Sequence, residues 1–371
     1  MQRLLWRNFD FWLFGAVLGL SIFGITMIRS AVAGNIELIR LNLVQRQFLY
    51  MLVGIVACLV VASIDYHFWT SINRFMYWFM FATLGVLFII GAAVFGSARW
   101  FDVGFLFIQP SEFVKIVMIL ILSDFFAKNL ENKHNINWIA RSFILTLGLT
   151  IWILLQPNLS TSIVIFVIWF TLLWISGLPL KYFLYFIIIG LIVSVVLFIL
   201  LINVNIYDLA KQTGIIQPYQ LDRIVNFLFP NPEARHGEQY NVNQALISIG
   251  SGGLLGQGYG QGSQVQLRFL KVRHSDFIFA AMAEEFGFVG VIIIMAVEFF
   301  VILRCLRAAR IARDVYGALI SYGVAVLIAF QGIVNMGMNL NMLPVTGLPL
   351  PFVSYGGSSL SVSYTHLTLP T

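Results

Sequence analysis

Long stretches without charged residues alternate with short polar segments along this chain. A helix that crosses the hydrocarbon core of a membrane needs about 20 mostly apolar residues, because the core is about 30 Å thick and each residue rises about 1.5 Å. Uninterrupted stretches of this kind predict membrane-spanning helices at residues 11–28, 47–64, 75–98, 182–205 and 315–336.

Less regular stretches predict the remaining spans. Residues 110–127 begin with a proline and carry Glu112, Lys115 and Asp124, which makes this the weakest span. The charge-free stretch 142–180 is too long for one helix, and Gln156-Pro157-Asn158 divides it into two. Another span is expected at residues 276–303. The pattern therefore predicts an all-α polytopic membrane protein.

Two segments between or after these spans are polar or rich in glycine and proline. Residues 206–275 hold no run that could cross a membrane, and residues 339–357 are expected to form a re-entrant or surface loop. A tenth span should follow, but residues 361–371 are rich in hydroxyl groups and too short to cross. We interpret them as a non-native tail. Residues 1–360 are expected to form one transmembrane domain.

Composition and charge support a membrane protein. Hydrophobic residues make up 60% of the chain and charged residues 10%, whereas soluble domains carry about 25% charged residues. We attribute the formal net charge of +6 to basic residues that orient the spans, not to nucleic-acid binding. Neither cysteine falls on a predicted outer loop, so no disulfide is expected. The first span is long for a signal-peptide core and is expected to be retained.

Lysine and arginine are more frequent on the short loops of one side of the predicted bundle, the side of the N-terminus. Such residues mark the cytoplasmic side of a membrane protein. The long segment 206–275 and the start of the 276–303 span are therefore predicted to face outward.

Asp276 lies where this polar segment becomes an apolar helix. As an N-cap it would bind free backbone N–H groups and experience the positive helix end, and both effects favour the ionised carboxylate. Such a group can act as a base towards a bound hydroxyl or coordinate a cation. From position alone a plain helix cap is the better interpretation, because caps are common.

Other charged residues lie at membrane depth, where they are costly and often functional. Glu284 and Glu285 lie about 12 Å deeper than Asp276 and point about 100° apart, so at least one should face the bundle interior. Glu112 and Lys115 are three residues apart and can pair on one helix face. Beside a polar cavity, a lysine and an arginine could instead hold an anionic diphosphate.

The glycine-rich run from Gly250 to Gly262 fits neither the Walker pattern nor the dinucleotide-binding pattern. We interpret it as backbone that packs closely or holds a substrate. His274 and Asp276 could share a cation, but two ligands are a weak signal, and the sequence has no Cys/His cluster.

An ordered series of motifs resembles the SEDS family, the RodA/FtsW group of bacterial peptidoglycan polymerases. These motifs are Arg99-Trp100, Gln109-Pro110-Ser111-Glu112 with Lys115, Gln156-Pro157-Asn158-Leu159, residues 249–262, residues 273–287 and residues 343–359. The resemblance covers nearly the whole chain up to residue 360, and the short N-terminus and residues 264–279 look more like the RodA, cell-elongation branch.

The resemblance implies ten transmembrane helices, the tenth truncated here, with a large extracytoplasmic loop between helices 7 and 8. It also implies polymerisation of lipid II in the bacterial cytoplasmic (inner) membrane, with a class B penicillin-binding protein as partner. The family's essential aspartate matches Asp276, in place of the plain cap, and its cavity residues match Glu112 and Lys115. Asn158 stands where the family usually has an aspartate, so Asn158 is given no catalytic role.

The resulting hypothesis is inverting glycosyl transfer. Asp276 would deprotonate the acceptor sugar, and undecaprenyl diphosphate would leave from the glycan donor. Arg99, Lys115, Arg273 or a divalent cation (Mg or Mn) could stabilise the leaving charge. No cofactor is certain. Two other classes stay open: a lipid-linked-sugar flippase that uses Glu284 and Glu285, and a non-enzymatic scaffold of a cell-wall complex.

Overall fold

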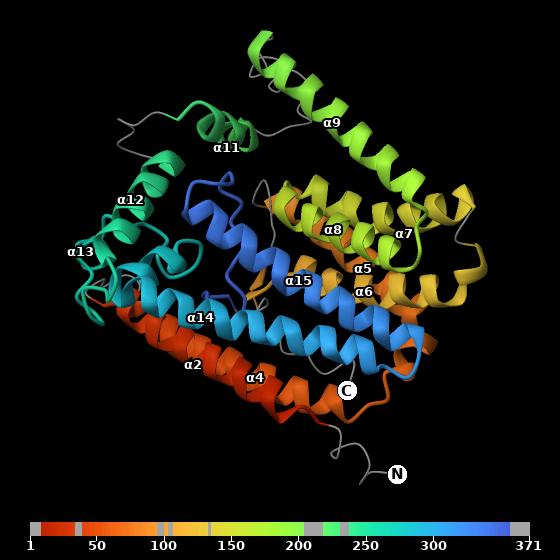
Figure 1. The fold of residues 1–371 in the computed structure, drawn as a ribbon, viewed down its shortest axis with the longest axis horizontal. Coiled ribbons are helices and arrows are strands. Elements are labelled where there is room, and N and C mark those ends of the chain that lie inside the picture. The colour runs from red at the N-terminus through yellow and green to blue at the C-terminus, as the bar shows by residue number, and fades with distance from the viewer. Residues whose placement is uncertain are drawn as a thin grey trace.

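The protein is a bundle of long helices, seen here in a computed structural model (Figure 1). The structure describes residues 9–33, 39–94, 100–102, 107–132, 135–203, 218–230 and 237–356. The long helices are α2 (Phe11–Val32), α4 (Leu43–Ala62), α5 (His67–Val94), α6 (Pro110–Lys128), α7 (Ile136–Leu155), α8 (Leu159–Ile175), α9 (Leu180–Asn203), α14 (Ile278–Ile311) and α15 (Val315–Asn339). Each predicted span thus corresponds to a helix, which confirms the all-α polytopic class.

By length and composition, six of the described helices can cross a membrane: α2, α4, α5, α7, α14 and α15. The predicted division of 142–180 is confirmed, because α7 ends at Leu155 and α8 begins at Leu159. The predicted 75–98 span is longer than expected, since α5 begins at His67. A two-residue antiparallel pair, β1 (Phe101–Asp102) and β2 (Phe107–Ile108), precedes α6.

The weakest predicted span, α6, lies in the middle of the bundle. It contacts α5, α8 and α15, and Glu112 and Lys115 on it are both buried. A charged pair at membrane depth is far less costly when protein rather than lipid surrounds it. The charges that weaken the hydropathy signal of α6 therefore indicate a helix in the centre of the bundle. They do not indicate a helix that is unsuited to the membrane.

Helix α9 is attached to the bundle mainly through aromatic rings near its start. Phe183 lies 4.4 Å from Trp174 between ring centroids, and Phe186 lies 5.8 Å from Trp169. Further along, side chains such as Ile189 and Leu191 are exposed. Figure 1 shows α9 leaning away from the other helices.

The polar segment contains shorter helices and, as predicted, no described helix long enough to span. These helices are α11 (Pro218–Leu228), α12 (Gly237–Gly252) and the single turn α13 (Ser263–Gln266). Helix α12 contacts α11, α13, α14 and α15. The three short helices therefore gather at the end of the bundle where α14 begins (Figure 1).

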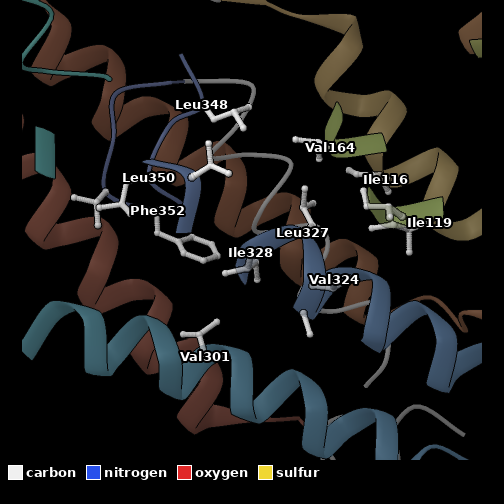
Figure 2. Close-up of a cluster of buried hydrophobic side chains, with 14 of the residues drawn as sticks. Ile116, Ile119, Val164, Val301, Val324, Leu327, Ile328, Leu348, Leu350 and Phe352 are labelled. Atoms are coloured by element: carbon white, nitrogen blue, oxygen red, sulfur yellow. The ribbon is translucent and has the colours of Figure 1, made fainter. Parts of the chain in front are cut away.

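After α15 the chain folds back into the bundle as a loop, residues 340–356. Its residues Leu348, Leu350, Phe352 and Val353 are buried in the main hydrophobic cluster, and Figure 2 shows Phe352 pointing towards Ile328 of α15. A Cβ atom on Gly24 of α2 would lie 2.6 Å from the Val353 carbonyl oxygen. Of the two predicted alternatives, this burial favours the re-entrant loop over the surface loop. The predicted tenth span and tail lie outside the described residues.

Candidate active site

Helix α14 is broken at Gly287, and the glycine-rich run fills the break. Gly287 has φ 67° and ψ −169°, outside the helical region. The backbone N–H groups of Gln257 and Gly258 donate to the carbonyl oxygens of Glu284 and Glu285, at 2.9 and 3.0 Å. In return, the N–H groups after the break, on Phe288 and Val289, donate to Gly253 and Leu254 at 2.9 and 3.1 Å. The loop thus satisfies the backbone groups that the break releases.

Only glycine fits at the centre of this contact. Gly256 has φ 81°, and a Cβ atom on it would lie 2.5 Å from the Glu285 carbonyl carbon. A Cβ atom on Gly287 would lie 2.6 Å from the Leu254 carbonyl oxygen. Of the two interpretations of residues 250–262, the close-packing backbone is the one that the contacts support. The nine residues of α14 before the break form a separately held segment that begins next to Asp276.

The predicted N-cap role of Asp276 is wrong. Helix α14 begins at Ile278, and Phe277 occupies the N-cap position. Asn339, at the end of α15, accepts from the Ala280 N–H at 3.2 Å through its Oδ1 atom. An amide from another helix therefore takes over a bond that a capping aspartate would make. The Asp276 carboxylate is left available for other partners.

The backbone around Asp276 is held by α15 and by the re-entrant loop. The Asp276 carbonyl oxygen accepts from the side-chain amides of Asn335 and Asn339, both at 3.1 Å. The Ser354 hydroxyl donates to the Ser275 carbonyl at 2.8 Å, and the Tyr355 N–H donates to the His274 carbonyl at 2.9 Å. These bonds fix the main chain while the Asp276 side chain remains partly exposed.

The Asp276 carboxylate faces the turn of the re-entrant loop. A Cβ atom on Gly347, which has φ 74°, would lie 3.6 Å from Asp276 Oδ2. Burial raises the pKa of Asp276 above its usual value of 3.8, and a hydrogen bond from Ser275 and the charge of Arg223 act in the opposite direction. Both the geometry and the raised pKa suit a group that takes up a proton from a bound hydroxyl.

Arg223 and Glu238 also belong to this site, and the sequence analysis missed them. Arg223 Nε donates to Glu238 Oε1 at 3.0 Å, and Nη1 donates to the Thr346 carbonyl at 3.1 Å. The same Thr346 carbonyl accepts from the Ser160 hydroxyl of α8. No sequence pattern predicts these contacts, because the residues that make them are separated by up to 186 positions along the chain.

The predicted pair on α6 is present and lies within the same set of helices. Lys115 Nζ is 2.7 Å from Glu112 Oε2, and both side chains are buried. The neighbouring Ser111 hydroxyl accepts from the Asn158 amide at 3.4 Å, at the end of α8 that carries Ser160. The starts of α6 and α8 are therefore linked to the re-entrant turn that faces Asp276. Arg99 lies outside the described residues.

The Glu284 carboxylate holds α13. It accepts from the Gln264 N–H at 2.7 Å, the Val265 N–H at 3.2 Å and the Ser263 hydroxyl at 3.3 Å. The side chain is fully buried. Glu284 therefore anchors the single turn of α13, and a role for it in a substrate cavity stays a prediction.

Glu285 and Arg273 both bind α2. The Ser30 hydroxyl of α2 donates to Glu285 Oε1. Arg273 donates from Nε to the Ala31 carbonyl at 2.6 Å and from Nη1 to the Leu270 carbonyl at 3.2 Å. These hydrogen bonds thus go to α2 and to Leu270, and a diphosphate-binding role for Arg273 stays a prediction.

A metal site was left open by the sequence. Within the described ranges, no three His, Cys, Asp or Glu side chains are grouped so that they could hold a metal ion. His274, the suggested partner of Asp276, has a buried Nδ1 atom and packs against the Tyr355 ring at 5.8 Å between centroids. A divalent cation remains a prediction.

The family model for FtsW, RodA and SpoVE, described as a cell cycle protein, matches residues 11–369. The chain belongs to this family. Among similar proteins, a probable peptidoglycan glycosyltransferase FtsW of Buchnera aphidicola is 30% identical over 97% of this chain and 90% of its own length. Stage V sporulation protein E of Bacillus subtilis is 32% identical over 86% of this chain and 83% of its own.

Solved structures of family members have the same architecture. The rod shape determining protein RodA of Thermus thermophilus superposes with a TM-score of 0.68 at 26% identity, covering 98% of this chain and 96% of that protein. A chain from a peptidoglycan synthase complex that coordinates polymerization and crosslinking superposes with a TM-score of 0.77 at 25% identity, with the same coverage. The predicted SEDS membership is thus confirmed.

Proposed function

We propose that this chain is a peptidoglycan glycosyltransferase that polymerises lipid II into glycan strands. The observation that carries the proposal is the position of Asp276: a partly exposed carboxylate at the start of a broken helix, facing the Gly347 turn. The names of its relatives, which include probable peptidoglycan glycosyltransferases, agree with this chemistry.

In this reaction Asp276 is the general base. The carboxylate takes the proton from the 4-hydroxyl of the acceptor sugar as that oxygen attacks the anomeric carbon of the donor glycan. The new C–O bond forms on the face opposite to the breaking bond, so configuration inverts, and undecaprenyl diphosphate leaves with the electron pair. A base works best when its pKa is close to the working pH, and burial moves the pKa of Asp276 in that direction.

The leaving diphosphate carries negative charge that the site must stabilise. Lys115, the predicted cation on α6, is held by Glu112, so the pair is close to neutral and suits a polar wall better than a strong anion site. Arg99 and Arg273 remain predicted contributors. A diphosphate is itself a good leaving group, so a second carboxylic acid is less needed than in glycoside hydrolysis.

The chain acts in the bacterial cytoplasmic membrane with Asp276 on the outer side. This orientation is supported by the distribution of lysine and arginine on the short loops. Its partner is a class B penicillin-binding protein that crosslinks the new strands, in keeping with the similarity to a chain of a polymerization and crosslinking complex. A role in cell elongation rests on the resemblance of residues 264–279 to the RodA branch.

The test is chain growth by the purified protein in detergent, supplied with fluorescent lipid II and with or without a class B partner. Glycan strands that muramidase digests are the expected product. Passage of lipid II across vesicles without chain growth would instead identify a flippase. Binding to the partner with neither growth nor passage would identify a scaffold.

A further inference from the structure

Arg223 connects three elements that are far apart in the sequence. It lies on α11, its Nε atom binds Glu238 at the start of α12, and its Nη1 atom binds the Thr346 carbonyl of the re-entrant loop. The fork of the guanidinium fits two acceptors at once, which a lysine ammonium cannot do with the same geometry. Arg223 therefore fixes the position of α11 and α12 relative to the re-entrant loop.

The Thr346 carbonyl is followed directly by Gly347, the residue that faces Asp276 Oδ2. The Ser160 hydroxyl of α8 donates to the same carbonyl, so the turn is attached to both α8 and α11. A turn whose backbone faces the reacting carboxylate determines where a substrate hydroxyl can approach. Loss of Arg223 would release one of these two attachments.

We propose that Arg223 is a positioning residue for glycosyl transfer: it holds the Thr346–Gly347 turn against Asp276 and places a positive charge where it stabilises the Asp276 carboxylate. The inference rests on the proposed polymerase function and names a residue that acts through Asp276. It assigns no contact between Arg223 and the substrate.

The charged groups that act on Asp276 support this role. Arg223 lowers the pKa of Asp276 against the effect of burial, and the like charge of Asp276 raises the pKa of Glu238. Asp222 of α11 in turn acts on Glu238. From α15 the groups that hold Asp276 are the neutral amides of Asn335 and Asn339, and from the re-entrant loop it faces Gly347. The balance of charge at Asp276 thus depends on the Arg223–Glu238 pair.

This balance gives two variants with opposite effects. In Arg223→Gln the positive charge is lost, so the acid limb of the rate–pH profile should move to higher pH. In Glu238→Gln the negative charge is lost and the guanidinium is released from its ion pair, so the limb should move down. Removal of a merely structural ion pair would not shift the limb in opposite directions for its two partners.

The experiment measures kcat for lipid II polymerisation between about pH 5 and 8 for the wild type, Arg223→Gln, Arg223→Lys and Glu238→Gln. Arg223→Gln should also lose roughly tenfold or more in kcat, because misplacement of a reacting group by about 1 Å can cost about a hundredfold. Arg223→Lys should keep the wild-type limb but not the full kcat, since it keeps the charge and loses the fork. Lys271→Gln, an exposed residue of the same polar segment, is the control for removal of one positive charge.

The outcomes separate the two proposals. If the wild type makes no glycan under any condition, the polymerase function itself is refuted. If the wild type polymerises and Arg223→Gln matches Lys271→Gln in kcat and acid limb, only the role of Arg223 is refuted. The same holds if Arg223→Gln and Glu238→Gln shift the limb in the same direction. Opposite shifts support the role, and melting temperatures of all variants show whether each one is folded.

Discussion

Gly287→Ala tests the break in α14, which separates the segment next to Asp276 from the rest of the helix. An added Cβ atom would lie 2.6 Å from the Leu254 carbonyl oxygen and closer still to the Gly256 nitrogen. Both atoms are backbone, so neither can turn aside as a flexible side chain would. The substitution must therefore displace the glycine-rich loop or change the backbone angles at residue 287.

The cost follows from two effects. A residue other than glycine in this region of backbone angles costs about 1–3 kcal/mol. Displacement of the loop breaks at least two of the four hydrogen bonds across the break, at about 0.5–1.5 kcal/mol each. Together they give about 2–6 kcal/mol. Because the displaced segment begins next to Asp276, polymerisation should fall along with stability.

The assay is thermal unfolding in detergent, read by intrinsic fluorescence, with the polymerisation rate measured on the same preparation. Gly250→Ala is the matched control: Gly250 lies in α12, and a Cβ atom there would meet nothing within 4 Å. The control should melt at or slightly above the wild-type temperature, since alanine favours a helix over glycine by about 1 kcal/mol. A Gly287→Ala protein that melts and polymerises like this control would refute the argument.

Three further variants probe the supports of the site. Glu284→Gln should lower the melting temperature, because an amide –NH₂ would face backbone N–H donors at a fully buried position. Each buried donor left without an acceptor costs about 1–3 kcal/mol, and an unchanged melting temperature would exclude the anchoring role. Lys115→Met should lower the free energy of unfolding by about 3–5 kcal/mol, because it leaves Glu112 buried and unpaired. The double variant with Glu112→Gln should recover part of this loss in the same melting assay. Asn339→Ala removes the acceptor for the Ala280 N–H and a donor to the Asp276 carbonyl. We therefore expect a lower polymerisation rate with unchanged partner binding. A wild-type rate would contradict that expectation.

The positions of the helices could be predicted from the sequence because lipid imposes a simple rule on length and polarity. This rule located both ends of α2, α4, α6 and α15 to within a few residues. The rule places a helix in the membrane but does not distinguish a lipid-facing helix from a protein-facing one. That is why α6, whose charges are buried inside the bundle, gave the weakest signal.

The site could be predicted only in part. Asp276 was identified from a motif, and the structure places it at a partly exposed position facing the re-entrant turn. The capping prediction failed because local position favours a cap at Asp276, whereas a distant residue, Asn339, binds the first turn of α14. Arg223 was missed for the same reason: its contacts with Glu238 and Thr346 exist only in the folded chain.

The adjacent acids Glu284 and Glu285 show a further limit. Their positions about 100° apart predicted that at least one would face the interior, and both are buried. Their separate partners, the first turn of α13 for Glu284 and Ser30 of α2 for Glu285, depend on tertiary packing. Helical spacing specifies direction but not the identity of the neighbour.

The most direct test of the central claim is the rate of lipid II polymerisation by Asp276→Asn, measured together with its melting temperature. Burial raises the pKa of Asp276, so the ionised carboxylate costs the folded protein stability relative to the unfolded chain, and an uncharged asparagine removes that cost. The account predicts a protein that melts at or above the wild-type temperature and forms no glycan strands. Normal strand formation by a folded Asp276→Asn protein would contradict it.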